Sequence, residues 1–220
     1  MTSYDLNRPT EVGRTNEHFV KGRFGHWSFR YLVDRTALFF DQRLNPDDPW
    51  ISRRAIDMLS SALRETDVAL EVGAGRSTRW FAERVHHLTS IESDPEWYSK
   101  VARDIDSLGN VNLRLFENPR DYVQALVEQE DCHFDFILID GISRGECALA
   151  ALPKLKPGGL IAIDNIERYL PSSSYSPQAR QQGDGPASEM WEEFADRTSN
   201  WRRFWSSNGV FDTCIWVASG

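Results

Sequence analysis

The chain has 220 residues, a length that suits one α/β domain with a short extension, and 40% of them are hydrophobic, enough to fill a core. Its formal net charge of −8 excludes the broad basic surface of most nucleic-acid-binding domains, so we expect no nucleic-acid partner. Three widely spaced cysteines without a CxxC motif argue against disulfides or a zinc site. The N-terminus does not resemble a signal peptide and the sequence contains no long apolar run, so we expect a cytoplasmic protein that does not enter membranes.

The first 49 residues are predicted to be an N-terminal extension. Residues 1–26 are polar and irregular, whereas apolar side chains between 27 and 40 recur at helical spacing. A turn cluster at 45–49 follows, and a second amphipathic helix at 51–62 leads into the first strand. Four aromatic residues of this region either cap a substrate pocket or, in the simpler interpretation, pack the helices onto the sheet: Trp27, Phe29, Tyr31 and Trp50.

Residues 68–78, VALEVGAGRST, form the pattern around which the rest of the chain is organised. A short apolar run, typical of a buried parallel strand, breaks at Gly73 and Gly75, and a helix is predicted to follow. Glycines let the backbone turn sharply and let a ligand lie against it, while the helix N-terminus exposes free N–H groups. The next strand ends at Glu92, about 20 residues after Gly73, where an acid can bind ribose hydroxyls.

Strands and helices then alternate along the chain. Helices are predicted at 95–108, from Asn118, and at 147–155, and strands at 111–116, 134–139 and 160–163. In an open parallel sheet, ligands bind beyond the carboxyl ends of the strands. We therefore expect the polar residues that end these strands to gather at one rim: Glu71, Glu92, Asp140, Asp164 and Asn165.

The C-terminal part departs from this alternation. Residues 169–187 are rich in Ser, Pro, Gln and Gly and are long for a connection, so they are either a lid over the site or a mobile linker. A helix is predicted at 188–198. Two further strands, at 201–205 and 210–217, are joined through Asn208-Gly209, a strong hairpin signal. These elements predict a doubly wound, Rossmann-like α/β sheet with a C-terminal antiparallel hairpin.

Over residues 50–217 the chain resembles the class I S-adenosylmethionine-dependent methyltransferases. The matching pieces are the glycine loop with its flanking Glu71 and Thr78, Glu92, the apolar strand that ends at Asp140, the segment LKPGG before the last parallel strand, and the hairpin. The resemblance implies a sheet of about seven strands, a methyltransferase domain over residues 50–220, and S-adenosylmethionine as cofactor. The cofactor-binding residues that it implies are Glu71, Gly73, Gly75, Ser77, Thr78, Glu92, Ser93, Glu117, Asn118 and Asp140.

The pair Asp164-Asn165 also resembles the metal-dependent O-methyltransferases of the catechol and caffeoyl-CoA type. That resemblance implies a magnesium ion bound by Asp140, Asp164 and Asn165, and methyl transfer to a hydroxyl of a small molecule with Asp140 and Asp164 as catalytic residues. A hydroxyl acceptor must lose a proton, to a base or through a metal. That subfamily has a lysine base shortly after the first aspartate, whereas this chain reads DGISR from 140 to 144; without a metal, the base is Asp140 or a histidine.

Two alternatives remain at this point. An NAD(P)-binding Rossmann oxidoreductase would use a similar glycine loop, but its fingerprint calls for a third small residue where Thr78 stands. A non-catalytic module that binds a cofactor and serves as an interaction domain would keep the loop without turnover. The sequence leaves open which acceptor is methylated and whether the chain forms a homo-oligomer.

Overall fold

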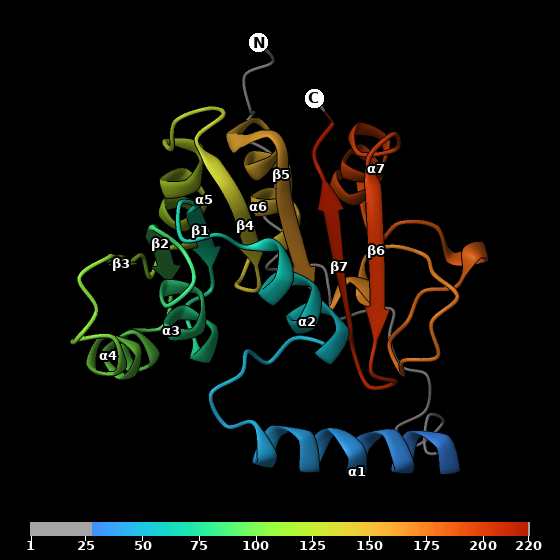
Figure 1. Ribbon diagram of the computed structural model, residues 1–220. Helices are drawn as coiled ribbons and strands as arrows, with labels where there is room; N and C mark the ends of the chain where they lie inside the picture. The colour runs from blue at the N-terminus through green and yellow to red at the C-terminus, as the bar shows by residue number, and fades with distance from the viewer. Residues whose placement is uncertain (1–27, 220) are drawn as a thin grey trace.

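A computed structural model describes residues 28–219, which form a seven-stranded sheet covered by helices on both faces (Figure 1). The strand order is β3-β2-β1-β4-β5-β7-β6. The strands are β1 (Val68–Val72), β2 (His87–Glu92), β3 (Val111–Leu115), β4 (Phe134–Ile139), β5 (Leu155–Asp164), β6 (Arg202–Ser207) and β7 (Asp212–Val217). The helices are α1 (Phe29–Leu44), α2 (Arg53–Ala62), α3 (Arg76–Ala82), α4 (Pro95–Asp104), α5 (Pro119–Val127), α6 (Arg144–Ala151) and α7 (Glu189–Arg197), with short 3-10 turns at Leu152–Lys154, Ile166–Arg168 and Gln182–Asp184.

The topology confirms the predicted doubly wound sheet with its C-terminal hairpin. Strands β1 to β5 are parallel, and β7 lies antiparallel between β5 and β6. The hairpin turns where the Asn-Gly signal predicted it: Gly209 has φ +80, and the side-chain oxygen of Asn208 accepts from the backbone N–H groups of Val210 and Phe211, both at 3.0 Å. Because left-handed backbone suits glycine, this dipeptide stabilises the reversal.

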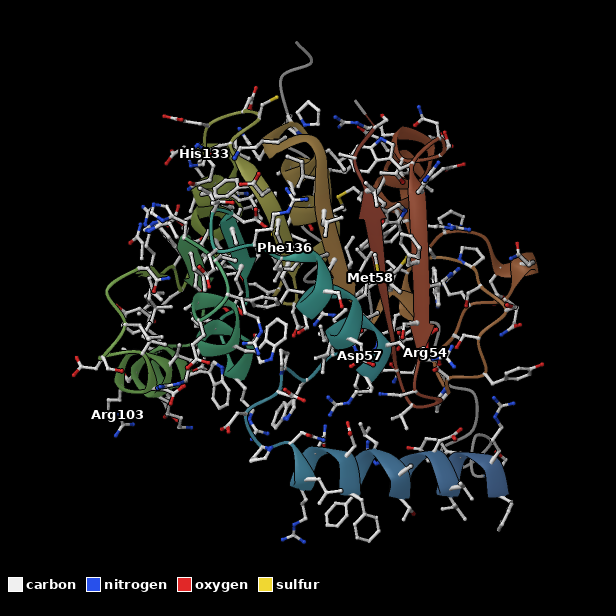
Figure 2. All side chains as sticks on the ribbon, viewed as in Figure 1. Arg54, Asp57, Met58, Arg103, His133 and Phe136 are labelled. Atoms are coloured by element: carbon white, nitrogen blue, oxygen red, sulfur yellow. The ribbon has the colours of Figure 1, made fainter. Side chains whose placement is uncertain are left out.

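The two faces of the sheet carry separate apolar cores. Helices α5, α6 and α7 cover one face, where Trp191 and Trp216 are among the largest fully buried side chains. Helices α2 and α3 cover the other face, where Phe136 of β4 packs on Phe81 with ring centroids 5.0 Å apart. Figure 2 shows Phe136 within the molecule, while Arg103 of α4 points outward. Burial on both faces explains why the central strands are apolar at consecutive positions.

Helix α1 corrects the interpretation that the N-terminal aromatic residues pack helices onto the sheet. None of its residues is buried, Phe29 is 84% exposed, and the helix runs along the rim formed by the carboxyl ends of the parallel strands (Figure 1). Charged side chains connect α1 to the body: the Arg30 guanidinium stands over the Tyr175 ring at 4.4 Å, and Asp41 accepts from Arg53 at 2.8 Å. Trp27 lies outside the described residues.

Two boundaries also differ from the prediction. The helix expected at 147–155 begins earlier, at Arg144, and ends at Ala151. The glycine turn expected before the last parallel strand lies within β5, whose pairing with β4 shifts register between Phe134 and Phe136. The longer β5 arises because backbone pairing across a bulge overrides a local turn signal.

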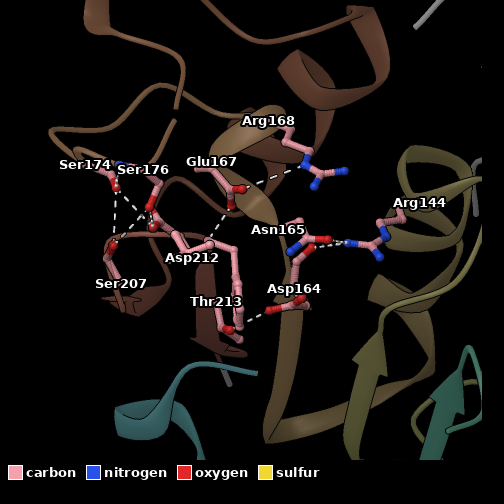
Figure 3. A network of polar contacts seen from close by, with 12 residues as sticks. Arg144, Asp164, Asn165, Glu167, Arg168, Ser174, Ser176, Ser207, Asp212 and Thr213 are labelled. Atoms are coloured by element: carbon pink, nitrogen blue, oxygen red, sulfur yellow. Dashed lines mark hydrogen bonds and ion pairs between the residues drawn. The ribbon is translucent and has the colours of Figure 1, made fainter. Parts of the chain in front are cut away.

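Residues 169–187 fold back on the sheet. The hydroxyl groups of Ser174 and Ser176 donate to Asp212 Oδ1 at 3.0 and 2.6 Å (Figure 3), and Arg180 N donates to Glu167 O at 2.9 Å. The segment is thus attached to the start of β7 and to the turn after β5. Across residues 28–219, no helix combines the length and the apolar character that crossing a membrane would require.

Candidate functional site

The loop after β1 lies backbone to backbone against the loop after β4. Gly73 has φ +104, and its N–H donates to Ile91 O of β2 at 2.8 Å. A Cβ atom at this position would lie 2.6 Å from Gly141 N and 2.7 Å from the carbonyl carbon of Asp140. Only glycine fits both the positive φ and the space, so Gly73 fixes the distance between the two loops.

The side chain of Glu71 lies beneath the glycine loop and holds it through hydrogen bonds. Its carboxylate is buried and accepts three hydroxyl hydrogen bonds, from Ser77 at 2.5 Å, Thr78 at 2.6 Å and Ser90 at 2.5 Å. Burial raises the pKa of Glu71 to about 7, and the hydroxyl donors act in the opposite direction. Since Thr78 Oγ1 also accepts from Gly75 N at 2.9 Å, these side chains hold the loop in shape.

A pocket of about 360 Å³ opens above this loop. On one side, Glu92 Oε1 accepts from the backbone N–H groups of Ser93 and Asp94 at 2.6 and 2.8 Å, which fixes the orientation of the carboxylate at the end of β2. On another side of the pocket, the indole N–H of Trp97 donates to Ala74 O at 2.7 Å and supports the glycine loop. The lining residues are Trp50, Gly73, Ala74, Gly75, Arg76, Ser77, Glu92, Ser93, Trp97, Asp140, Gly141 and Ile142.

Six of the residues predicted to bind the cofactor line this pocket, namely Gly73, Gly75, Ser77, Glu92, Ser93 and Asp140. Glu71 and Thr78 lie beneath the loop, both fully buried. Glu117 is exposed, and Asn118 Oδ1 caps α5 by accepting from Arg120 N at 2.8 Å. Trp97 was not predicted as a site residue, because its place in the apolar stripe of a helix indicates a core position. Trp50 was predicted either to cap a substrate pocket or to pack a helix onto the sheet, and the structure places it in the lining of this pocket.

The three predicted magnesium ligands all accept hydrogen bonds from protein donors. Asp164 is 3% exposed, and its Oδ1 accepts from Thr213 Oγ1 at 2.6 Å. Asp140 Oδ1 and Asn165 Oδ1 both accept from Arg144, at 2.7 and 3.2 Å. Since protein donors already engage these oxygens, the residues do not fit a bound divalent ion. Within residues 28–219, no group of three or more His, Cys, Asp or Glu side chains is placed to hold one.

The two predicted catalytic carboxylates differ in their access to the pocket. The side chain of Asp140 is 28% exposed and lines the pocket, whereas Asp164 is buried behind it. Burial raises the pKa of Asp140, although the neighbouring Arg144 lowers it. Burial also raises the pKa of Asp164 well above its ordinary value, and the charge of Asp140 adds to this. Only Asp140 of this pair is therefore placed to exchange a proton with a molecule in the pocket.

The described histidines lie away from the rim. His87 begins β2 and His86 precedes it, and His133 directly precedes β4, so all three are at the amino ends of parallel strands. Figure 2 shows His133 on the side of the molecule opposite α1. His18 and His26 lie outside the described residues. The structure therefore does not bring His86, His87 or His133 to the pocket as a base.

Known proteins share this fold. A family described as a methyltransferase domain matches residues 70–166. A candidate caffeoyl-CoA O-methyltransferase from Staphylococcus aureus is 16% identical over 86% of this chain and 98% of that one, with a TM-score of 0.54. A candidate methylase from Haemophilus influenzae is 12% identical over 76% of this chain and 87% of that one, with a TM-score of 0.50.

A protein from Bordetella parapertussis, described as a possible exported protein, has a TM-score of 0.51 and 14% identity over 74% of this chain; this chain spans 65% of that protein's length. No curated protein matches the sequence significantly. The family match covers the segment from β1 to the turn after β5, which contains the glycine loop, Glu92 and Asp140. Residues 70–166 therefore match a methyltransferase domain, and the sheet that contains them has the Rossmann-like fold of methyltransferases.

Proposed function

We propose that this chain transfers the methyl group of S-adenosylmethionine to a hydroxyl group of a small-molecule acceptor. The observation that carries the proposal is the pocket between the glycine loop, Glu92 and Asp140. By the sequence resemblance, the loop holds the methionine part of the cofactor and Glu92 holds the ribose hydroxyls. The oriented carboxylate of Glu92 supports that assignment, because ribose hydroxyls are donors for such a group.

In this proposal the chemistry is one displacement. The acceptor oxygen attacks the methyl carbon, the carbon–sulfur bond breaks, and its electron pair stays on sulfur to give S-adenosylhomocysteine. The acceptor proton passes to the carboxylate of Asp140. A raised pKa makes Asp140 a stronger proton acceptor than an ordinary aspartate. Because the sulfonium donor is already activated, the rest of the rate enhancement comes from holding the two reactants in line.

The acceptor would bind beneath the N-terminal segment. Residues 28–49 then act as a substrate cap on the catalytic domain of residues 50–219. Two observations support this: α1 runs along the rim, and Trp50, which directly follows the segment, lines the cofactor pocket with the Arg76 guanidinium 5.3 Å from its ring. The net charge of −8 favours a small molecule over a nucleic acid, and three free cysteines suit the cytoplasm.

Calorimetry with S-adenosylhomocysteine tests the cofactor assignment. We expect micromolar binding and no comparable affinity for NAD; the reverse result would contradict the proposal. Methyl transfer from labelled S-adenosylmethionine is then measured on panels of hydroxylated and of amine-bearing small molecules. Asp140→Asn should lower kcat for a hydroxyl acceptor about 10²-fold or more while the thermal midpoint stays nearly constant. Turnover of amines alone would refute the hydroxyl assignment.

A further inference from the structure

The rim between β4 and β5 already holds a cation. Arg144, the first residue of α6, extends its guanidinium between the ends of these strands, beside Asp164 and Asn165 (Figure 3). We propose that this guanidinium occupies the position that magnesium takes in the O-methyltransferases that the sequence resembles, so that this chain needs no divalent metal and Arg144 positions Asp140. The inference rests on the proposed function only in that Asp140 serves as the base.

The contacts of Arg144 use its whole donor set. Nε donates to Gly141 O at 2.9 Å. Nη1 donates to Asp164 O at 2.5 Å and Asn165 Oδ1 at 3.2 Å. Nη2 donates to Asp140 O at 3.1 Å and Asp140 Oδ1 at 2.7 Å. A guanidinium has five N–H groups, and these contacts match them one for one. A metal ion could reach the same oxygens only by displacing this group.

Local preference does not explain an arginine at this position. A positive charge in the first turn of a helix opposes the helix dipole, and the Arg144 side chain is only 14% exposed. Burial acts to lower its pKa, but Asp140, Asp164 and other nearby groups raise it above the ordinary value, so the side chain stays charged. A buried charge is tolerated only when it is paired and hydrogen-bonded, as here. The rim is therefore built around a cation.

The same contacts orient the proposed base. One bond from Nη2 engages a carboxylate oxygen of Asp140, and the bonds to the backbone carbonyls of Asp140 and Gly141 hold the turn that carries these two residues. Since both residues line the pocket, a change at Arg144 reaches the site through them. Arg144 is thus a positioning residue: its guanidinium, in place of a metal ion, holds the carboxylate of Asp140 in position.

Mn²⁺ binding, followed by the loss of the free-ion electron paramagnetic resonance signal, tests the proposal without an acceptor. Wild-type protein should bind no stoichiometric Mn²⁺ at 1:1 concentrations of about 100 μM, and chelation should leave its affinity for S-adenosylhomocysteine unchanged. Arg144→Ala should gain one Mn²⁺ site, at least about tenfold tighter than any wild-type binding, since it frees oxygen ligands. The double variant Arg144→Ala with Asp140→Asn should lose that gain.

Arg144→Lys is the matched control, because it keeps the charge with fewer hydrogen bonds; it should melt at a lower temperature and bind no Mn²⁺. One-to-one Mn²⁺ binding by the wild type overturns the proposal whether or not any variant folds. A folded Arg144→Ala that gains no Mn²⁺ site overturns it as well. Failure to bind S-adenosylhomocysteine instead argues against the proposed function and leaves the Mn²⁺ results unaffected.

Discussion

Substitution of Gly73 by alanine probes the contact that sets the floor of the pocket. The new methyl group would lie 2.6 Å from Gly141 N, and the neighbouring atoms are backbone, which cannot rotate away. A non-glycine residue at φ +104 costs about 1–3 kcal/mol, and overpacking a close contact costs about 1–3 kcal/mol more. The free energy of unfolding should therefore fall by roughly 2–6 kcal/mol, a large share of a typical domain's stability of about 5–15 kcal/mol.

Thermal unfolding and calorimetry measure the two consequences separately. For a chain of this size, a loss of 1 kcal/mol lowers Tm by about 2–4 °C, so Gly73→Ala should melt at least about 4 °C lower. It should also bind S-adenosylhomocysteine at least about tenfold more weakly, because a shift of Asp140 and Gly141 reshapes the pocket, and 1.4 kcal/mol corresponds to that factor.

Gly75→Ala is the matched control for stability. Gly75 has φ −172, and an added Cβ would lie 3.7 Å from Ser77 Oγ and from Trp97 Nε1, which is ordinary contact. Its Tm should stay within about 2 °C of the wild type, since both backbone and space tolerate the methyl group. If Gly73→Ala has the same Tm as the wild type and binds S-adenosylhomocysteine with the same affinity, the inferred close contact between the two loops is refuted.

Three further predictions concern other parts of the site. The pKa of Glu71 is raised to about 7 from an ordinary 4.5, so between these pH values the folded state keeps a proton that the unfolded state releases. The free energy of unfolding should therefore fall by about 3 kcal/mol from pH 4.5 to 7. Urea titrations of Glu71→Gln should show a smaller fall over the same pH range. Glu92→Ala should weaken S-adenosylhomocysteine binding by about 1–3 kcal/mol in calorimetry, and unchanged affinity would remove its assigned role. Asp212→Asn should weaken the attachment of residues 169–187 to β7, because an amide has one acceptor oxygen where the carboxylate uses two. Trypsin should therefore cut the variant after Arg180 faster than it cuts the wild type. If cofactor does not slow this cleavage in the wild type, the result argues against a lid.

The sequence determined the frame of this protein because the frame depends on local patterns. The central parallel strands β1, β4 and β5 are largely apolar and end at a glycine or a polar residue, and burial on both faces of the sheet requires such runs. The positive φ of Gly73 and the Asn-Gly hairpin depend on the identity of one or two residues. For the same reason, the sequence alone predicted Glu92 at the end of its strand, where the structure places it in the pocket.

Only the tertiary structure decided what those residues contact. Asp140, Asp164 and Asn165 follow neighbouring strands as predicted, but whether they face an ion or a guanidinium depends on where α6 begins, and the chain starts that helix at Arg144. Trp50 reaches the pocket from the connection between α1 and α2, whose path no local pattern specifies. Helix α1 has the apolar spacing of a packed helix, yet the faces of the sheet are covered by other helices, so its apolar side chains remain exposed at the rim. Periodicity records that a side chain is apolar, whereas its burial depends on which elements compete for the same surface.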